Sequence, residues 1–334
     1  MTIFTRDTNR VTFLFESGTY AQPSGTSGNW LGLVESHNLT ESENHFEIRY
    51  AGTDNRNFGQ LVNGPRDYEG TISYYPQNFR MFGFALGSSQ NISGTINRHI
   101  ISELNGDGAY AFTSGTNQLT QFPSFTIKDS KKGLADGQHY IRTINGNVVD
   151  SLTLTATQGA PITIETSYKG QTFVLGSKTT DILNISDEDT SRPYIWSDMV
   201  FYLPSGTAMN EINELKYTIE NNVENRHYVN GSVVAQAMIP TMRNHTLELT
   251  LDANSTWYKT FTDFYMNGSE FNAQMLLTQS ATEYGAFTFS GCEITALSTP
   301  SEVEGIDEIS ITIRPKSVGI TGSDSVRLYN PYWG

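Results

Sequence analysis

The sequence predicts a mainly β protein made of two tandem units, each a β-sandwich or half-barrel with a short flanking α-helix. Charged residues make up only 17% of the 334 residues and aromatic residues 12%, a composition that favours strands over helices. Apolar and polar residues alternate in many short segments, which is typical of half-buried strands. One such strand pattern also occurs twice in the chain.

The repeated pattern consists of a glycine, an alternating strand, a loop and a second alternating strand. Its first copy occupies residues 146–154 and 160–165, and its second copy occupies residues 291–297 and 308–314. The sequence numbers of the two leading glycines differ by 145 (291 − 146 = 145). A strand pair that recurs within one chain predicts an internally duplicated fold.

A short helix is expected in each unit. Apolar residues have helix-like spacing at 77–86, where Gly87 is a suitable C-cap, and again at 257–266, which Gly268 follows. The sequence numbers of these two glycines differ by 181 (268 − 87 = 181). Because this offset exceeds that between the leading glycines, the first copy contains extra residues, which we expect near 90–121 in surface loops.

The expected boundaries place the first unit at 1–170, a linker at 171–198 and the second unit at 199–334. The first unit begins with a polar N-terminal arm of about 12 residues. Residues 171–198 lack sustained periodicity, which is typical of a linker. Residues 51–67 are dominated by Gly, Asn, Asp, Pro and Arg and predict a long loop, a length that is usually functional.

The chain is acidic, with a net charge of −14. Proteins that bind nucleic acid tightly are normally basic, because phosphate contacts supply most of their affinity. Specific DNA binding is therefore not expected. An acidic surface that only keeps the chain soluble remains the alternative. The N-terminus lacks a signal-peptide core and no apolar run reaches membrane-spanning length, which predicts a soluble protein made in the cytoplasm.

No pattern in the sequence predicts a catalytic, cofactor or metal site. The six histidines have no metal-ligand spacing, and the one cysteine, Cys292, lies in an alternating strand where a buried side chain is expected. Nucleophile-elbow and phosphate-loop motifs are absent. A glycoside hydrolase that uses two carboxylates and a carbohydrate-binding β-sandwich remain alternatives, although no particular residues point to either.

The last residues of the sequence are largely apolar and aromatic, and such a segment needs a covering surface. It is expected either to dock onto a neighbouring subunit or to pack on its own unit. The residues expected to dock are Tyr329, Tyr332 and Trp333.

Several short motifs are found across the two units. The first unit contains a Glu-Ser region at 34–39, a glycine-containing strand at 68–74 and the Leu86-Gly87 end of an apolar helix. The strand at 146–154 carries a Ser-Leu pair, and a Gly-Cys form of its start stands in the second unit at Gly291-Cys292. Together these motifs resemble the tail tube proteins of long-tailed, siphovirus-like bacterial or archaeal viruses, in a duplicated form.

The resemblance implies a structural virion protein of the tail, not an enzyme, that is synthesised and assembled in the host cytoplasm. Such proteins form stacked rings, and a duplicated chain would form a homotrimer with pseudo-sixfold symmetry. The implied partners are further copies of the chain and the terminator, tape measure and distal tail proteins. Genomic DNA would pass through an acidic bore during ejection without specific binding, and no cofactor or membrane insertion is implied. A baseplate hub or distal tail protein of the same fold is the alternative.

The resemblance also implies a role for the long loop at 51–67, which would contact the next ring. Arginine side chains in and just before the loop would pair with acidic residues of that ring. The expected contact residues are Arg49, Asp54, Arg56, Arg66 and Asp67.

Overall fold

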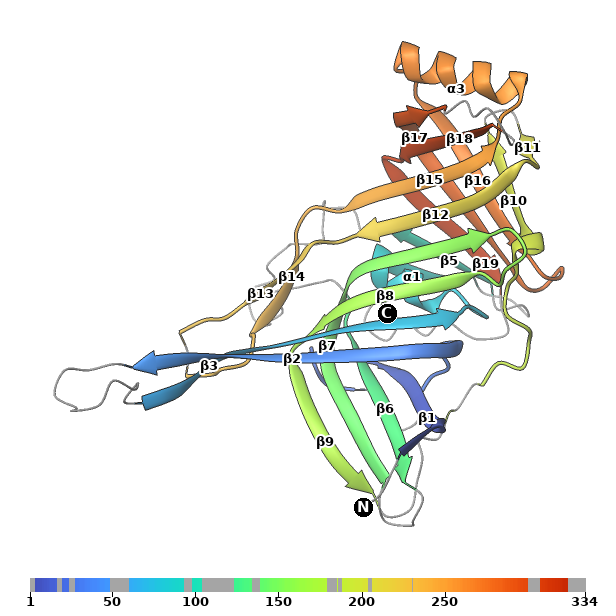
Figure 1. Cartoon of the computed structure of the whole chain (residues 1–334). Helices are drawn as coiled ribbons and strands as arrows, with labels where there is room; N and C mark the ends of the chain where they lie inside the picture. Colours follow the sequence, from blue (N-terminus) through green and yellow to red (C-terminus); the bar gives the residue numbers. More distant parts are fainter. Residues whose placement is uncertain are drawn as a thin grey trace.

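Strands make up most of the chain in the computed structural model, and the mainly β prediction is confirmed (Figure 1). The structure describes residues 4–16, 20–23, 28–48, 60–92, 98–103, 123–133, 139–178, 185, 188–203, 206–229, 231–299 and 307–323. Within these residues, α1 (Arg80–Leu86) and α3 (Ser255–Asn267) occupy the places where the sequence predicted helices. None of the helices in the described segments is long and apolar enough to cross a membrane.

The strands are bounded as follows: β1 (Phe4–Phe15), β2 (Leu33–Ile48), β3 (Gln60–Tyr75), β4 (Gly87–Ile92), β5 (Arg98–Glu103), β6 (Phe125–Gly133), β7 (His139–Thr157), β8 (Thr163–Gly170), β9 (Thr172–Lys178), β10 (Met199–Leu203), β11 (Thr207–Met209), β12 (Ile212–Glu220), β13 (Val223–Arg226), β14 (Ala237–Pro240), β15 (Asn244–Asp252), β16 (Phe271–Thr278), β17 (Tyr284–Ser298), β18 (Glu308–Arg314) and β19 (Ser317–Ser323). A 3-10 turn, η1 (Trp196–Asp198), precedes β10.

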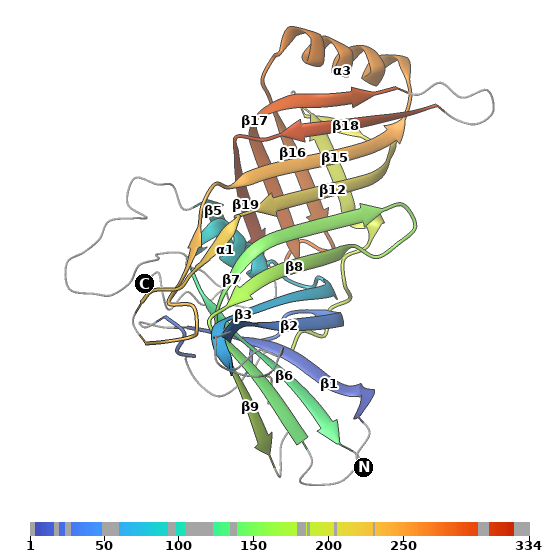
Figure 2. The same cartoon turned by 60° about the vertical axis from the view of Figure 1, so that its left-hand side comes forward.

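One long antiparallel sheet runs through the whole molecule in the order β2-β3-β8-β7-β12-β15-β18-β17 (Figure 2). Its first four strands come from the N-terminal half of the chain and its last four from the C-terminal half. The halves meet where β7 pairs with β12, over the residue pairs from Ser151↔Glu220 to Thr157↔Glu214. The sheet is therefore continuous across the middle of the chain.

Two further sheets extend from the ends of β7 and β17. The first back sheet has the order β1-β6-β7-β9. The second back sheet has the order β11-β10-β16-β17-β19-β5-β4. β7 and β17 each belong to a back sheet and to the long sheet, so each strand turns a corner between two layers.

The repeated glycines of the sequence lie at these two corners. Gly146 has a φ of +69° and Gly291 a φ of +61°, a conformation that other residues rarely adopt. A Cβ atom at Gly146 would lie 2.9 Å from the Cβ of Gln171, so space is limited there as well. The pattern noticed in the sequence therefore marks the points where β7 and β17 leave the back sheets.

The strand pairings on the two sides of the β7–β12 junction match residue by residue. Lys169 of β8 pairs with Val148 of β7, and Arg314 of β18 pairs with Glu293 of β17. The second pair is the counterpart of the first, because each residue number is higher by 145, the difference between the two leading glycines (314 − 169 = 145). The register then shifts by one residue at counterpart places, between Val149 and Ser151 and between Ile294 and Ala296. β2 and β12 also match. The register of β2 shifts between Val34 and Ser36, and that of β12 shifts between Ile212 and Glu214, so counterpart residues of these two strands differ in number by 178 (212 − 34 = 178).

α1 is buried along its whole length and packs against both halves of the chain. On one side the Phe84 ring lies 4.8 Å from that of Phe125 in β6. On the other side Phe82 and Phe79 lie 5.1 Å and 5.7 Å from Phe287 in β17, measured between ring centroids. Aromatic packing of this kind holds the first half of the chain on the second back sheet.

The hairpin of β2 and β3 is longer than the sequence predicted. Residues 60–67, expected in the loop at 51–67, form the first part of β3 instead. Gly64 and Pro65 suggested a loop, but they lie at a register shift of the hairpin, and the ladder resumes beyond it. We call residues 42–48 and 60–67 the arm, because β3 leaves β8 at Tyr68 and the hairpin projects from the body (Figure 1).

Two other segments for which no strand was expected contain one. The N-terminal residues expected to form a polar arm belong to β1, and residues from Asn9 onward pair with β6 in an unbroken ladder. The first residues of the expected linker form β9, which pairs with β7 from His139 to Asn145.

Part of the extra sequence expected near 90–121 forms the β4–β5 hairpin. β5 pairs with β19, with Ile101 opposite Ile320, and both side chains are fully buried. A segment of the first half thereby extends the second back sheet. The rest of that expected insertion, from residue 104 onward, lies outside the described residues.

Candidate functional site

The face of the long sheet that does not pack on α1 and the back sheets is polar, and we call it the open face. Strand alternation creates it, because successive side chains point to opposite sides of a sheet. In β12, Leu215 and Tyr217 are fully buried, whereas Lys216 and Thr218 between and beside them reach the surface. The same alternation occurs in β15 and β18.

Hydroxyl groups dominate the open face. At the β7–β12 junction the Oγ1 atoms of Thr153 and Thr218 lie 3.2 Å apart and form a hydrogen bond. A row of directly opposite residues continues from this pair across the sheet in both directions. The hydroxyl-bearing residues of the open face are Ser36, Thr40, Thr71, Ser73, Ser151, Thr153, Thr155, Thr157, Thr163, Ser167, Thr218, Thr246, Thr250, Ser298, Ser310 and Thr312.

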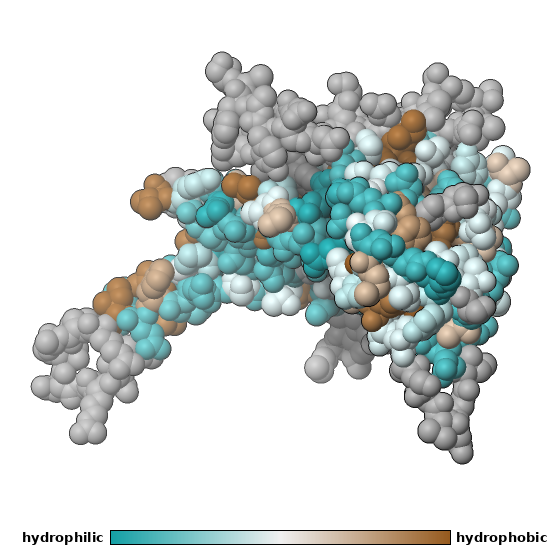
Figure 3. All heavy atoms as spheres, turned by 90° about the horizontal axis from the view of Figure 1, so that it is seen from above, coloured by the Kyte–Doolittle hydropathy of each residue, from teal (hydrophilic) through white to brown (hydrophobic). Residues whose placement is uncertain are grey.

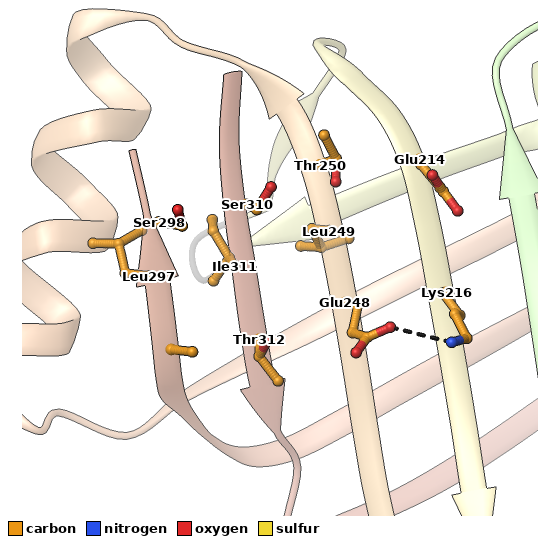
Figure 4. Close-up of a pocket in the computed structure, with 11 residues that line it drawn as sticks. Glu214, Lys216, Glu248, Leu249, Thr250, Leu297, Ser298, Ser310, Ile311 and Thr312 are labelled. Carbon is orange, nitrogen blue, oxygen red and sulfur yellow. Dashed lines mark ion pairs between the residues drawn. The ribbon is translucent and has the colours of Figure 1, made fainter. Parts of the chain in front are cut away.

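Carboxylates outnumber cations on the open face. Lys216 Nζ lies 3.4 Å from Glu248 Oε2, which neutralises one acidic side chain (Figure 4). The remaining carboxylates give the face a negative charge. Its acidic residues are Glu69, Glu165, Glu214, Glu220, Glu248, Asp252, Glu293 and Glu308, and its basic residues are Lys169, Lys216 and Arg314.

A shallow hollow of about 340 Å³ lies on this face between β12, β15, β17 and β18 (Figure 4). Its lining is a mixture of hydroxyls, the Lys216–Glu248 pair and the edges of aliphatic side chains. No group of three or more His, Cys, Asp or Glu side chains in the described segments is placed to hold a metal ion. Cys292 is buried, as expected, and burial raises the pKa of its thiol to about 12, so the thiol is not activated at neutral pH.

The long sheet has two strands that are paired on one side only. Within the described part of the chain, β2 pairs with β3 alone, and residues 293–298 of β17 pair with β18 alone. Unpaired strand edges are a liability, because their free N–H and C=O groups can pair with another chain. The two free edges lie at opposite ends of the sheet (Figure 2).

The structure describes two of the residues expected to contact the next ring, and both make contacts within the chain. Arg66 Nη2 lies 3.1 Å from Glu43 Oε1 across the arm. Asp67 Oδ1 accepts a hydrogen bond of 2.7 Å from Asn225 Nδ2 and lies 3.0 Å from His227 Nε2. Asn225 and His227 belong to the β13–β14 segment, which therefore binds to the base of the arm. The other expected residues, Arg49, Asp54, Arg56, Tyr329, Tyr332 and Trp333, lie outside the described residues.

A buried polar cluster joins the arm strand β2 to the first back sheet. His37 Nδ1 lies 3.1 Å from Asp129 Oδ2, and His37 Nε2 lies 2.6 Å from the hydroxyl of Tyr168. Arg142 Nε donates a hydrogen bond of 3.0 Å to the same Asp129 oxygen. Burial opposes ionisation of Asp129, but the hydrogen bonds and charges of His37 and Arg142 outweigh it and lower the pKa of this carboxyl below its usual value.

A second cluster of the same composition joins the β4–β5 hairpin to the second half. His245 Nε2 lies 3.0 Å from Glu103 Oε1, and His245 Nδ1 lies 3.0 Å from the hydroxyl of Tyr217. Burial again opposes ionisation, but His245, the backbone N–H of Val318 and Arg243 together lower the pKa of Glu103. Sequence reasoning missed both clusters, because their members come from strands far apart in the chain.

Comparison with known proteins identifies the family. The sequence profile described as phage tail tube protein matches residues 14–326. No curated protein matches the chain. Among solved structures, the chain is similar to the tail tube of SPP1, solved by solid-state NMR and cryo-electron microscopy, with 16% identity and a TM-score of 0.33 over 39% of this chain and 80% of the other. Because the family profile spans nearly the whole described sequence, the chain belongs to the phage tail tube protein family.

Proposed function

We propose that three copies of this chain form one ring of a tail tube, and that each chain contributes two duplicated tube units. The observation that carries this proposal is the β7–β12 junction. β17 is the counterpart of β7 and β2 is the counterpart of β12, and these are the strands whose edges are free. Pairing β17 of one chain with β2 of the next would repeat the internal junction and leave no edge exposed.

The internal junction also supplies the register of the proposed contact between chains. Thr153 pairs with Thr218 inside the chain. Their counterparts are Ser298 (298 − 153 = 145) and Thr40 (218 − 40 = 178), which both carry hydroxyl groups as well. We therefore expect Ser298 of one chain to lie opposite Thr40 of the next. A head-to-tail contact of this kind generates a closed ring when its rotation closes.

A cysteine pair tests this register. Thr40→Cys and Ser298→Cys, combined in a chain whose buried Cys292 is replaced by alanine, should form disulfide-linked trimers under mild oxidation. Opposite residues in antiparallel strands have Cβ atoms about 4.5–5.5 Å apart, close enough for a disulfide with slight adjustment. Non-reducing electrophoresis measures the products. We expect trimers as the largest species, because a closed ring leaves no free cysteine.

The matched control moves one cysteine by a single residue. In Thr40→Cys with Leu297→Cys, the second thiol points to the other face of the sheet, so it should not cross-link. Equal cross-linking of both pairs, or a ladder of products without a limiting trimer, would contradict the proposed ring. Negative-stain images of the assembled protein should show long regular tubes, which a hub or distal tail protein would not form.

In this ring the open face lines the bore, and its carboxylates repel the DNA phosphates so that the genome passes without being held. The hydroxyl groups keep the wall hydrated and uncharged between the carboxylates. No catalytic step is proposed for this wall. The implied partners remain the terminator, tape measure and distal tail proteins in the virion tail.

Reversing charge on the open face should create DNA binding. Glu165→Lys with Glu214→Lys in the unassembled chain should bind a short duplex at low salt, whereas the unchanged chain should not. Fluorescence anisotropy measures binding, and the affinity should fall steeply as salt is added, because counterions are released. The control, Glu188→Lys with Glu224→Lys, makes the same change in net charge elsewhere on the surface and should bind more weakly. Equal binding by both variants would argue against a special role for the open face.

The arm remains our proposal for contact between successive rings. It projects from the body and carries the exposed apolar side chains of Phe46, Ile48 and Leu61. Figure 3 shows hydrophobic residues along the projection. Exposed apolar side chains on a projecting hairpin are typical of a contact surface. The arginine and aspartate residues expected from the sequence, together with docking of the C-terminal aromatic residues onto a neighbouring chain, belong to the same proposal.

A further inference from the structure

The two helices follow counterpart strands, yet their surroundings differ. Phe84 of α1 packs on Phe125, and Phe264 of α3 packs on Phe271 at a centroid distance of 4.7 Å. Phe125 lies opposite Asn147 and Phe271 lies opposite Cys292. Asn147 and Cys292 differ in number by 145, as the leading glycines do (292 − 147 = 145), so Phe125 and Phe271 are counterparts as well. The residues after Phe84 in α1 can therefore be compared directly with those after Phe264 in α3.

The comparison shows a face that is buried on α1 and exposed on α3. Ala85 and Leu86, which follow Phe84, are fully buried, whereas Tyr265 and Met266, which follow Phe264, are 44% and 75% exposed. Tyr258 is 49% exposed and lies two turns earlier on the same side of α3. We call Tyr258, Tyr265 and Met266 the α3 stripe. Tyrosine and methionine are enriched at protein interfaces, and such a stripe is unusual on a free surface.

α1 packs on the second back sheet through Phe82 and through Phe79, the residue that precedes the helix. Phe79 lies so close to Gly285 in β17 that a Cβ atom there would come within 2.5 Å of its ring. The next strand of this sheet, β19, is covered at its edge by β5, and Ile320 is fully buried as a result. The helix and the hairpin of the first half thus cover the part of the second back sheet formed by β17 and β19.

The first back sheet exposes the counterpart positions. Tyr140 in β7 corresponds to Gly285 (285 − 140 = 145), and Leu175 in β9 corresponds to Ile320 (320 − 175 = 145). Tyr140 is 41% exposed and Leu175 is 57% exposed, and both lie on the same face of the sheet, with Arg142 opposite Leu175. We call Tyr140 and Leu175 the β9 patch. It lies at the place where the second back sheet is covered.

We infer that the α3 stripe of one chain packs on the β9 patch of the next chain, as α1 packs on the second back sheet within the chain. This inference rests on the proposed ring. It adds a contact between the back-sheet layers of two neighbouring chains to the proposed pairing of β17 with β2 in the long sheet. α3 and β9 lie at opposite ends of the molecule, so a contact between them joins two chains head to tail (Figure 1). Between α3 and β16 only residues 268–270 intervene, so the second half has no counterpart of the β4–β5 hairpin to compete for the patch.

Charge placed on either surface tests the contact. Met266→Glu and Leu175→Glu should each weaken ring formation at least tenfold, because each would place a carboxylate in an apolar contact between chains. The double variant Met266→Lys with Leu175→Glu should recover most of this loss through a new ion pair between chains. Native mass spectrometry across a concentration series measures the fraction of chains in rings.

Met242→Glu is the matched control, because Met242 is 71% exposed but lies between β14 and β15, away from both surfaces. It should assemble like the unchanged chain, and circular dichroism should show that all variants keep their fold. Assembly of Met266→Glu and Leu175→Glu equal to that of Met242→Glu would overturn the inference. If the Thr40→Cys and Ser298→Cys cross-link still forms in that case, the proposed ring stands without the α3 contact. If the unchanged chain forms no rings and the cysteine pair forms no cross-link, both the proposed ring and the α3 contact are overturned.

Discussion

Phe82→Ala should lower the free energy of unfolding of the unassembled chain by about 3–5 kcal/mol, the usual cost of truncating a fully buried phenylalanine. The side chain is 0% exposed and contacts Phe287 across the two halves of the chain. Its loss leaves a cavity at the point where α1 holds the second back sheet. Urea denaturation followed by tryptophan fluorescence and circular dichroism measures the change.

The control for Phe82→Ala is Tyr265→Ala on α3. Tyr265 is exposed in the free chain, so its truncation should change unfolding by less than about 0.5 kcal/mol. A loss of less than about 1 kcal/mol for Phe82→Ala would mean that α1 does not couple the two halves as the packing indicates. A separation of the unfolding curves seen by the two probes would show that the halves unfold independently in the variant.

Asp129→Ala should destabilise the chain by about 3–5 kcal/mol, because it leaves Arg142 and His37 without their shared buried partner. The substitution removes an acceptor that links β2, β6 and β7. Asp129→Asn preserves the shape and one acceptor oxygen, so it should cost less. Thermal and urea unfolding at pH 7 measure both variants.

The same cluster predicts how stability depends on pH. The pKa of Asp129 is lowered in the folded state, so its stabilising contribution is complete above the ordinary value of 3.8 and is lost as pH falls through the lower, folded-state value. Stability should therefore fall between about pH 5 and pH 2, and less steeply in Asp129→Asn. An unchanged slope in Asp129→Asn would show that other carboxylates, such as Glu103, dominate acid unfolding.

Local chemistry explains which elements could be predicted from the sequence. Gly87 and Gly268 end the two helices in the left-handed conformation, as their positions after apolar helical segments indicated. Gly146 and Gly291 were recognisable because a corner between two sheets requires an unusual backbone conformation. Such features depend on neighbouring residues, so they are visible in one sequence.

Long-range pairing explains what the sequence did not reveal. The β5–β19 ladder joins strands from the two halves of the chain, and nothing local to Ile101 indicates that Ile320 is its partner. Gly64 and Pro65 suggested a loop because the register shift that accommodates them depends on the opposite strand. The open face was partly predictable, since serine and threonine alternate with apolar residues at 151–157, but only the sheet order places these side chains beside those of the second half.

The binding of the β13–β14 segment to Asp67 has a consequence for how rings stack. β13 and β14 occupy the place in the second half that the arm occupies in the first, yet they are bound to the base of that arm, with the N–H of Arg66 donating a hydrogen bond of 2.8 Å to the carbonyl of Val233. Among the described residues, each chain therefore has one projecting arm. In the proposed ring, equivalent arms would recur about every 120°, and a ring rotated by about 60° on its neighbour would present a bound hairpin to each arm. The bore would have nearly sixfold symmetry, while the contacts that set the rotation of one ring on the next would have threefold symmetry.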